Sequence, residues 1–232
     1  MTLQALYQQF LNHPESQWIM RPQNAELLYN YIKNHKIKKI LELGCGIGAA
    51  TSIMALAFKD KGETDYHIDS MEQFDKCIKI AEKMIPEEFK KNITIHKSDA
   101  IVWSSAEIPY YNFSIYETLP DGEYDLYLED GPSPFMQEEH YIDLPNGVIH
   151  KLTLDGKIKS GTQIIYDGRL ESLKLLERYF SANYLLTYFS PQGNFNVLER
   201  KDNELKLGND RYEAIKKLNY FEDDKDNINN KK

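Results

Sequence analysis

The chain has 232 residues and a formal net charge of −8 at pH 7, with 41% hydrophobic and 28% charged residues. This length suits one large domain or two small ones, and the composition excludes a mostly disordered chain. An acidic chain is a poor binder of nucleic acid, whose affinity depends on cations that neutralise phosphates. No apolar run approaches the roughly 18–20 residues of a membrane span, and the N-terminus has no secretory signal pattern. Two cysteines, Cys45 and Cys77, make neither a disulfide framework nor a zinc motif, so we expect a cytoplasmic protein.

The N-terminal part, residues 1–36, is expected to be a helical extension. Apolar residues at helical spacing predict a first helix over residues 3–11. A second helix is expected to begin near Asn24, whose side chain can cap it. The basic run over residues 33–39 has no interleaved aromatic residues. We therefore interpret this run as a solvated surface and expect no nucleic-acid partner.

Strand-like and helix-like segments alternate from residue 38 onward. The expected strands cover residues 38–43, 66–71, 93–96, 124–129 and 162–166. This alternation predicts parallel strands with helices on both faces of one sheet. Two last strand-like runs, at 184–189 and 195–199, are joined by a turn too short for a parallel crossover, so they must be antiparallel. The predicted fold class is α/β: a Rossmann-like, doubly wound sheet of seven strands, mostly parallel, with a C-terminal antiparallel hairpin in a domain over residues 37–200.

Three further segments flank or interrupt this alternation. Residues 108–122 are rich in aromatic side chains and fit no regular element. We expect a loop insertion near the functional site there, with a surface wrap packed on the core as the alternative. Residues 201–220 are expected to form a C-terminal helical segment, and the polar residues 221–232 a disordered tail.

A glycine-rich turn follows the first predicted strand and opens a nearly all-apolar helix. Glycines allow a tight turn and a close approach to a ligand, and the helix N-terminus offers free N–H groups. The spacing of Gly44, Gly46 and Ala49 fits the dinucleotide-binding fingerprint. The run from Glu42 through Gly44, Gly46 and Gly48 fits a second pattern, E/D-x-G-x-G-x-G.

This run resembles the first motif of class I S-adenosylmethionine (SAM)-dependent methyltransferases. The resemblance extends over about Lys38 to Arg200, because the terminal antiparallel hairpin is similar to the sixth and seventh strands of that family. It implies that SAM is the cofactor and that the glycine turn, including Cys45, lies against it. A nicotinamide dehydrogenase would not end in such a hairpin.

The resemblance also implies an acid at the end of the second strand that holds the ribose hydroxyls. Glu72 and Asp69 both qualify, and the spacing from Glu72 to Ala81 in the next helix favours Glu72. A carboxylate can accept two hydrogen bonds from a diol, although Glu72 is also a favourable charge at a helix N-terminus. Asp99 and Ala100 match the family's acid and small residue near the adenine. Asp99 is equally suited to cap a following helix.

The chemical end of the site is expected where the fourth and fifth strands end, because ligands of open α/β sheets lie beyond the carboxyl ends of the strands. Asp130 begins a Gly-Pro-Ser-Pro run that resembles the D-G-P-H-type ending of small-molecule O-methyltransferases, with Ser133 in place of His. Asp167 should lie beside Asp130, although it can also cap the next helix. Arg169 is either a contact for an anionic substrate or a solvated charge.

A base for an acceptor hydroxyl could come from Asp130, Asp167 or a histidine with an ordinary pKa near neutral pH. His140 and His150 lie in a helix-like segment after Asp130. Metal-dependent catechol-type O-methyltransferases carry an Asp-Asn pair after the fifth strand, and Gly168 stands where that Asn would be. We therefore expect no metal.

The combined prediction is a SAM-dependent methyltransferase that acts on an oxygen of a small molecule, with Asp130, Asp167 and His140 as catalytic candidates. The alternatives are a protein or RNA methyltransferase, or an inactive SAM-binding protein. No membrane partner is expected, and a homodimer is possible.

Overall fold

The computed structural model describes residues 1–132, 144–190 and 195–207. Its helices are α1 (Leu3–Leu11), α2 (Pro22–Asn34), α3 (Ala49–Asp60), α4 (Asp75–Met84), α5 (Glu87–Lys90), α6 (Val148–Leu154) and α7 (Leu170–Phe180), with one 3-10 turn at Ser16–Trp18. Its strands are β1 (Lys39–Leu43), β2 (His67–Glu72), β3 (Ile93–Lys97), β4 (Ala100–Ser105), β5 (Ile108–Tyr116), β6 (Leu126–Glu129), β7 (Gln163–Asp167), β8 (Tyr184–Ser190) and β9 (Phe195–Arg200).

Seven strands form one sheet in the order β3-β2-β1-β6-β7-β9-β8. The pairs β2–β3, β1–β2, β1–β6 and β6–β7 are parallel, while β7–β9 and β8–β9 are antiparallel. The predicted fold class is therefore confirmed, including the antiparallel C-terminal hairpin. Strand order reverses beside β1, so the carboxyl ends of β1 and β6 flank the position at which such sheets bind ligands.

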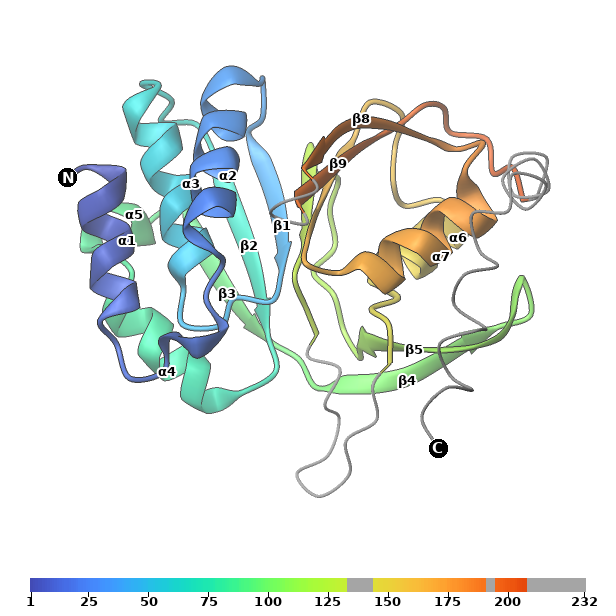
Figure 1. Cartoon of the computed structure of the whole chain (residues 1–232), viewed down its shortest axis with the longest axis horizontal. Helices are drawn as coiled ribbons and strands as arrows, with labels where there is room; N and C mark the ends of the chain where they lie inside the picture. The colour runs from blue at the N-terminus through green and yellow to red at the C-terminus, as the bar shows by residue number, and fades with distance from the viewer. Residues whose placement is uncertain (133–143, 191–194, 208–232) are drawn as a thin grey trace, which may run out of the picture.

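Helix α3 is buried along almost its whole length. Every residue from Ala49 to Phe58 is buried, because α3 packs against the sheet on one side and against α1 and α2 on the other. Figure 1 shows α1, α2 and α3 together on one side of β1, β2 and β3. This packing explains why the helix shows no polar face in the sequence.

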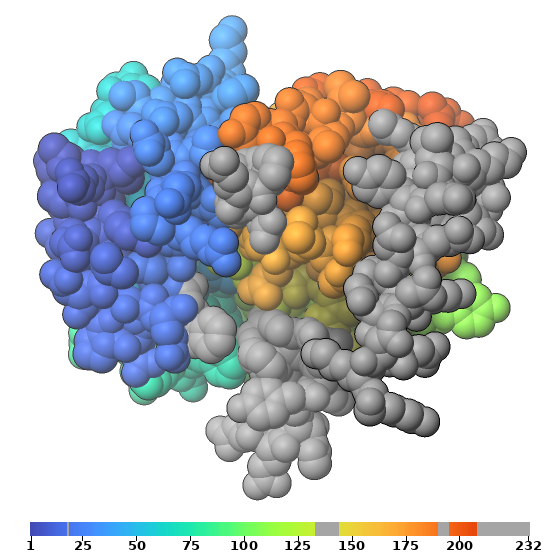
Figure 2. Space-filling view, viewed as in Figure 1, coloured from blue at the N-terminus to red at the C-terminus, as the bar shows by residue number. Residues whose placement is uncertain are grey.

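A second core lies on the opposite face of the sheet. It joins residues of β1, β6 and β7, among them Leu43, Tyr127 and Tyr166, to α6, α7 and the β4–β5 hairpin. Figure 1 shows α6, α7 and this hairpin on the other side of the sheet from α1–α3. Figure 2 shows the same division at the surface, with the N-terminal helices in blue and α7 in orange.

The expected loop insertion at residues 108–122 is corrected by the structure. Residues 108–116 are strand β5, which pairs with β4 in a separate antiparallel sheet. Phe113 and Ile115 are buried in the second core, whereas Tyr110, at the exposed tip, has φ of 73° and is fully exposed. The last four residues of β5, Phe113 to Tyr116, are all buried, so this end of the strand is covered on both faces.

The N-terminal helices differ from the prediction at one position. The second helix begins at Pro22 rather than near Asn24, and a proline suits a first helical position because its missing N–H is not needed there. Asn24 is instead fully buried and donates to Asp167. Residues 201–207 contain no helix, and the remaining part of the expected C-terminal segment and tail lies outside the described residues.

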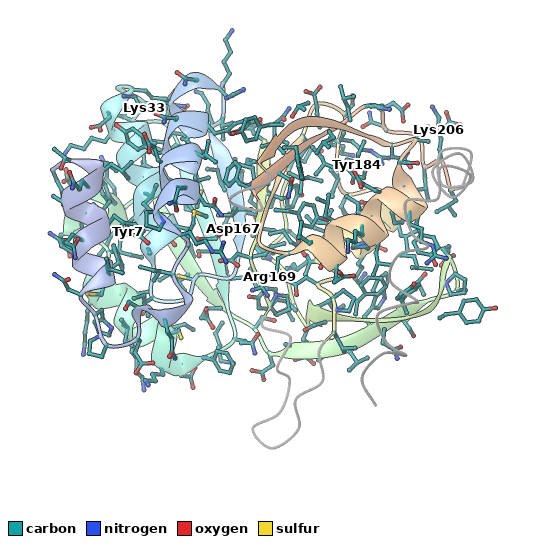
Figure 3. All side chains as sticks on the ribbon, viewed as in Figure 1. Tyr7, Lys33, Asp167, Arg169, Tyr184 and Lys206 are labelled. Atoms are coloured by element: carbon teal, nitrogen blue, oxygen red, sulfur yellow. The ribbon has the colours of Figure 1, made fainter. Side chains whose placement is uncertain are left out.

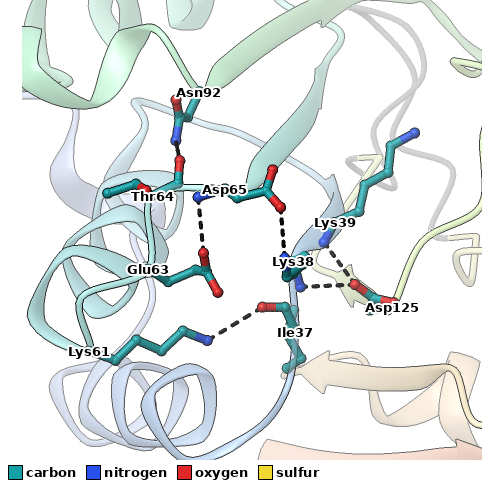
Figure 4. A network of polar contacts seen from close by, with 9 residues as sticks. All are labelled: Ile37, Lys38, Lys39, Lys61, Glu63, Thr64, Asp65, Asn92 and Asp125. Carbon is teal, nitrogen blue, oxygen red and sulfur yellow. Dashed lines mark hydrogen bonds and ion pairs between the residues drawn. The ribbon is translucent and has the colours of Figure 1, made fainter.

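The basic run before β1 is tied to acidic partners at the amino end of the sheet. Both backbone N–H groups of Lys38 and Lys39 donate to Asp125 at 2.9 Å, and the Lys38 ammonium lies 2.7 Å from Asp65 (Figure 4). The Lys38 side chain is 57% exposed, as expected for a solvated surface. Of the helices in the described ranges, none combines the length and apolarity needed to cross a membrane.

The burial of α3 gives a stability prediction. Ile53→Ala should lower the free energy of unfolding by about 2–5 kcal/mol, because the fully buried side chain leaves a cavity between the sheet and the N-terminal helices. Lys59→Ala in the same helix is the control; its ion pair with Glu88 is about half exposed, so its loss should cost no more than about 1 kcal/mol. Urea unfolding measures both, and equal losses would contradict this packing.

Candidate functional site

A cavity of about 530 Å³ opens beyond the carboxyl ends of β1, β2 and β6. Its lining comes from the glycine turn, the end of β2, the start of α4 and the N-terminal region: Glu15, Ile19, Met20, Gly44, Cys45, Gly46, Ile47, Ala49, Ala50, Glu72, Gln73, Phe74, Cys77, Tyr116, Asp130, Gly131 and Arg169. The cavity lies where the sequence predicted a ligand site.

The glycine turn is shaped by two different demands on its glycines. Gly44 has φ of 105°, and a Cβ there would lie 2.9 Å from the backbone carbon of Asp130 and from the nitrogen of Gly131. Glycine is therefore required for the loops after β1 and β6 to touch. Gly46, with φ of 52°, has nothing within 4 Å of the place where its Cβ would be. That side of Gly46 is open.

Glu72 rather than Asp69 reaches the cavity. Oε1 of Glu72 accepts from the backbone N–H groups of Gln73 and Phe74, each at 2.8 Å, and Oε2 accepts from Gly46 N–H at 2.7 Å. Burial raises the pKa of Glu72, against the effect of these bonds. Asp69 bonds elsewhere, to His96 and to the Tyr124 hydroxyl.

The N-terminal region closes one side of the cavity, which the sequence did not reveal. Glu15, Ile19 and Met20 line it. The Glu15 carboxylate lies 2.6 Å from the Lys76 ammonium of α4, and the Tyr7 hydroxyl donates to the Met20 carbonyl at 2.9 Å. These contacts hold the segment between α1 and α2 across the cavity.

Asp130 and Asp167 come together at the ends of β6 and β7, as predicted. Arg169 donates through Nη2 to the carbonyl and to a carboxylate oxygen of Asp130. Burial and the charge of Asp167 raise the pKa of Asp130 well above its ordinary value, although Arg169 opposes this. Burial also raises the pKa of Asp167, against the hydrogen bond from Asn24. Figure 3 shows Asp167 and Arg169 between the N-terminal helices and α7.

Glu129, directly before Asp130, is a buried acid that sequence reasoning missed. Its side chain has no solvent exposure, and neither carboxylate oxygen has a hydrogen-bond partner in the described part of the chain. Burial raises its pKa to about 8, with the Arg169 charge opposing and the Asp130 charge adding to the shift. The sequence did offer an indication of this residue, because Glu129 is an acid at the end of a predicted strand whose other positions are mostly apolar.

Several predicted residues do not line the cavity. Glu42 is fully buried and accepts from Thr51 of α3 at 2.5 Å and from Ser70. Burial raises its pKa to about 7. Asp99 is exposed and pairs with Lys97, and the helix that it was to cap is strand β4, which Ala100 begins.

Of the two histidine candidates, His150 contributes no base to the cavity. His150 lies in the second core, with its ring 4.8 Å from that of Phe113. Burial lowers its pKa to about 3, and neither ring nitrogen has a partner among the described residues. His140 lies outside the described residues. Among the described candidates, the carboxylates therefore remain as possible bases.

The sequence matches the family model of protein-L-isoaspartate(D-aspartate) O-methyltransferases over residues 4–118, just under half of the chain. No curated protein matches it significantly. Similar solved structures include a SAH-bound methyltransferase, PaMTH1, from Podospora anserina (16% identity, TM-score 0.54, 86% of this chain and 88% of that chain). Others are an O-methyltransferase from Bacillus cereus in complex with SAH (15%, 0.54, 86% and 90%) and TomG from Streptomyces achromogenes in complex with SAM (14%, 0.54, 86% and 89%).

At these identities the solved structures show the fold, and the family match covers β1, the glycine turn and β2. The chain thus resembles the class I SAM-dependent methyltransferases in its fold and over the matched residues 4–118. The cavity fits the cofactor of that class in two respects. The open side of Gly46 leaves room that a Cβ would fill, and Oε2 of Glu72 accepts one bond, which leaves a lone pair for a ligand hydroxyl.

The raised pKa of Glu129 predicts how stability depends on pH. Glu129 holds its proton more tightly in the folded state, where its pKa is about 8, than in the unfolded chain, at 4.5. The folded state therefore binds more protons in this window, and stability should fall as pH rises through it. Glu129→Gln should flatten the fall by up to about 1.4 kcal/mol per pH unit.

Urea unfolding between about pH 5 and about pH 9 measures this dependence. Glu123→Gln is the control, because the Glu123 side chain is 79% exposed and should leave the slope unchanged. Parallel curves for wild type and Glu129→Gln would contradict the raised pKa.

Proposed function

We propose that this protein is a SAM-dependent methyltransferase and that it transfers the methyl group of SAM to an oxygen atom of a small molecule. The observation that carries this proposal is the pair of carboxylates, Asp130 and Asp167, beside the glycine turn. Both pKa values are raised by burial. A carboxylate with a raised pKa is a better proton acceptor, and acceptor hydroxyls need a base as the new bond forms.

The cofactor would lie along the glycine turn. Glu72 would accept a hydrogen bond from a ribose hydroxyl, while its other bonds, to Gly46 and Phe74, hold the turn and the start of α4 together. Phe74 and Ile19 supply apolar surface to the cavity. SAM brings a methyl group on a sulfonium, so the protein has to align the acceptor and exclude water.

Asp130 is the proposed proton acceptor, because it lines the cavity and lies next to the glycine turn. Arg169 fixes the Asp130 backbone and carboxylate. Asp167 would act on Asp130 through its charge, since its own carboxylate receives the Asn24 amide. Whichever of these carboxylates is ionised also favours a cationic sulfonium over a neutral product.

Methylation of a protein carboxylate is the second candidate, because the isoaspartate O-methyltransferase model matches residues 4–118. That match ends before Asp130 and thus covers the proposed cofactor half only. The acceptor half holds three acids, Glu129, Asp130 and Asp167, and Arg169 there donates to Asp130, which leaves little positive charge for an anionic acceptor. An RNA acceptor is disfavoured by the net charge of −8.

The cofactor site is tested by a matched pair of glycine variants. Gly46→Val places a branched side chain in the open space of the cavity, and SAH affinity should fall at least about tenfold. Gly62→Val is the control, because Gly62 also has a positive φ (77°) and no neighbour within 4 Å, but does not line the cavity. Calorimetric titration with SAH measures both. Equal affinities in the two variants would move the cofactor away from this turn.

The acceptor chemistry is tested with methyl-labelled SAM and a mixed metabolite pool, the labelled product giving the methylated atom. Asp130→Asn should lower turnover by at least about tenfold and change SAH affinity much less. Metal-independent transfer, the sequence-based prediction, requires that EDTA leave turnover intact. Activity abolished by EDTA and restored by magnesium would make Asp130 and Asp167 metal ligands instead.

A further inference from the structure

Three buried polar side chains stand in one row across the carboxyl end of the sheet. Glu129 of β6 is the register partner of Tyr166 of β7, and Tyr166 is the register partner of Asn196 of β9. Register partners on adjacent strands point to the same face of a sheet. Tyr127 and Leu198, two residues away on β6 and β9, belong to the second core, so the row faces that core and not α3.

Every polar atom at the end of these three side chains lacks a partner in the described part of the chain. They are both carboxylate oxygens of Glu129, the hydroxyl of Tyr166, and the oxygen and nitrogen of the Asn196 amide. All three residues have no solvent exposure. Buried polar groups are nearly always hydrogen-bonded. Because these three neighbouring side chains do not bond each other, a polar ligand group next to them would supply the missing hydrogen bonds.

A satisfied group of the same core provides the contrast. The Thr153 hydroxyl of α6 lies 2.6 Å from both the Ile149 carbonyl and the Tyr184 hydroxyl. The second core can thus satisfy a buried hydroxyl with its own groups. His150 of the same core is also unpaired, but Glu129, Tyr166 and Asn196 are unpaired side by side on three adjacent strands.

The row is one residue from the proposed reaction site. Glu129 directly precedes Asp130, and Tyr166 directly precedes Asp167. Because successive side chains of a strand point to opposite faces, the two aspartates and the row lie on the two sides of the same strand ends. A small molecule placed beyond these ends could present one atom to Asp130 and another group to the row.

The charges around Glu129, Tyr166 and Asn196 limit which chemical groups this row could bind. Glu129 and Asp130 are acids, and the nearby cation, Arg169, donates to Asp130. Glu129 offers acceptors, and Tyr166 and Asn196 offer both donors and acceptors. A carboxylate or phosphate would be buried beside two further acids while Arg169 is held by Asp130, whereas a hydroxyl or amine can donate to a carboxyl oxygen of Glu129.

We propose that Glu129, Tyr166 and Asn196 form an acceptor subsite that binds a hydrogen-bond-donating, non-anionic group, an amine or a hydroxyl, of the methyl acceptor. This inference rests on the proposed small-molecule methyl transfer and adds the substrate class. The group bound here is distinct from the oxygen that receives the methyl group.

The first test needs no substrate. If the polar atoms of the row have no partner in the absence of a ligand, Tyr166→Phe and Asn196→Leu should leave the melting temperature unchanged or raise it. Each substitution then removes only unpaired polar atoms. Thr153→Val is the matched control and should lower it by about 2–4 °C or more. A loss in Tyr166→Phe and Asn196→Leu as large as in the control would show satisfied structural groups and overturn the proposal.

The second test uses three probes on one carbon skeleton with SAH-saturated protein: benzylamine, benzyl alcohol and benzoate. Benzylamine and benzyl alcohol should raise the melting temperature of the wild type, and benzoate should not. Both shifts should be lost in Asn196→Leu, while SAH affinity changes less than about twofold. Failure of SAH to bind the wild type would count against the proposed function itself. Normal SAH binding, with no shift from either donor probe or with a shift from benzoate, would overturn the subsite alone.

Discussion

The contact between the loops after β1 and β6 is the constraint on which the rest of the site depends. A Cβ on Gly131 would lie 2.8 Å from the Cα of Gly44, and one on Gly44 would lie 2.9 Å from the Asp130 backbone. Two backbones can approach this closely only where both residues are glycine. The contact sets the glycine turn against Asp130, so the proposed cofactor site and the proposed base share one rigid boundary.

Several acidic side chains are buried close together at these strand ends, and this burial shifts their pKa values. Glu42, Glu72, Glu129, Asp130 and Asp167 all end or follow central strands, and burial raises the pKa of each. Their hydrogen bonds give these acids different roles. The Glu42 carboxylate accepts from Thr51 and Ser70, and the Glu72 carboxylate accepts from backbone N–H groups. Asp130, next to Arg169, is left facing the cavity. Structural acids thus surround the carboxylate proposed to act in chemistry.

The sheet could be predicted from the sequence because the patterns that indicate strands and helices are local. Apolar strands, helix periodicity and a short final turn predict the sheet class without any tertiary contact, and the glycine turn with Glu72 follows from position along the chain. The β4–β5 hairpin was missed because Pro109 and Asn112 interrupt its alternation. The role of Asn24 was missed because its partner, Asp167, is 143 residues away. Long-range pairs leave no periodic trace.

The two halves of the chain carry different kinds of information about function. Residues 4–118, which match a methyltransferase family model, include the glycine turn and Glu72. These residues would bind the cofactor in the same way whatever the methyl acceptor is. Glu129, Tyr166 and Asn196 lie beyond that match, in strands whose other inward positions are apolar except for Arg200 at the far end of β9. A buried acid without a partner is costly in a core, and hydrophobic residues of similar volume would relieve that cost. A polar row at this place is therefore better explained by a ligand that it binds than by a contribution to stability. The specificity of the proposed methyl transfer should be sought in this half of the chain.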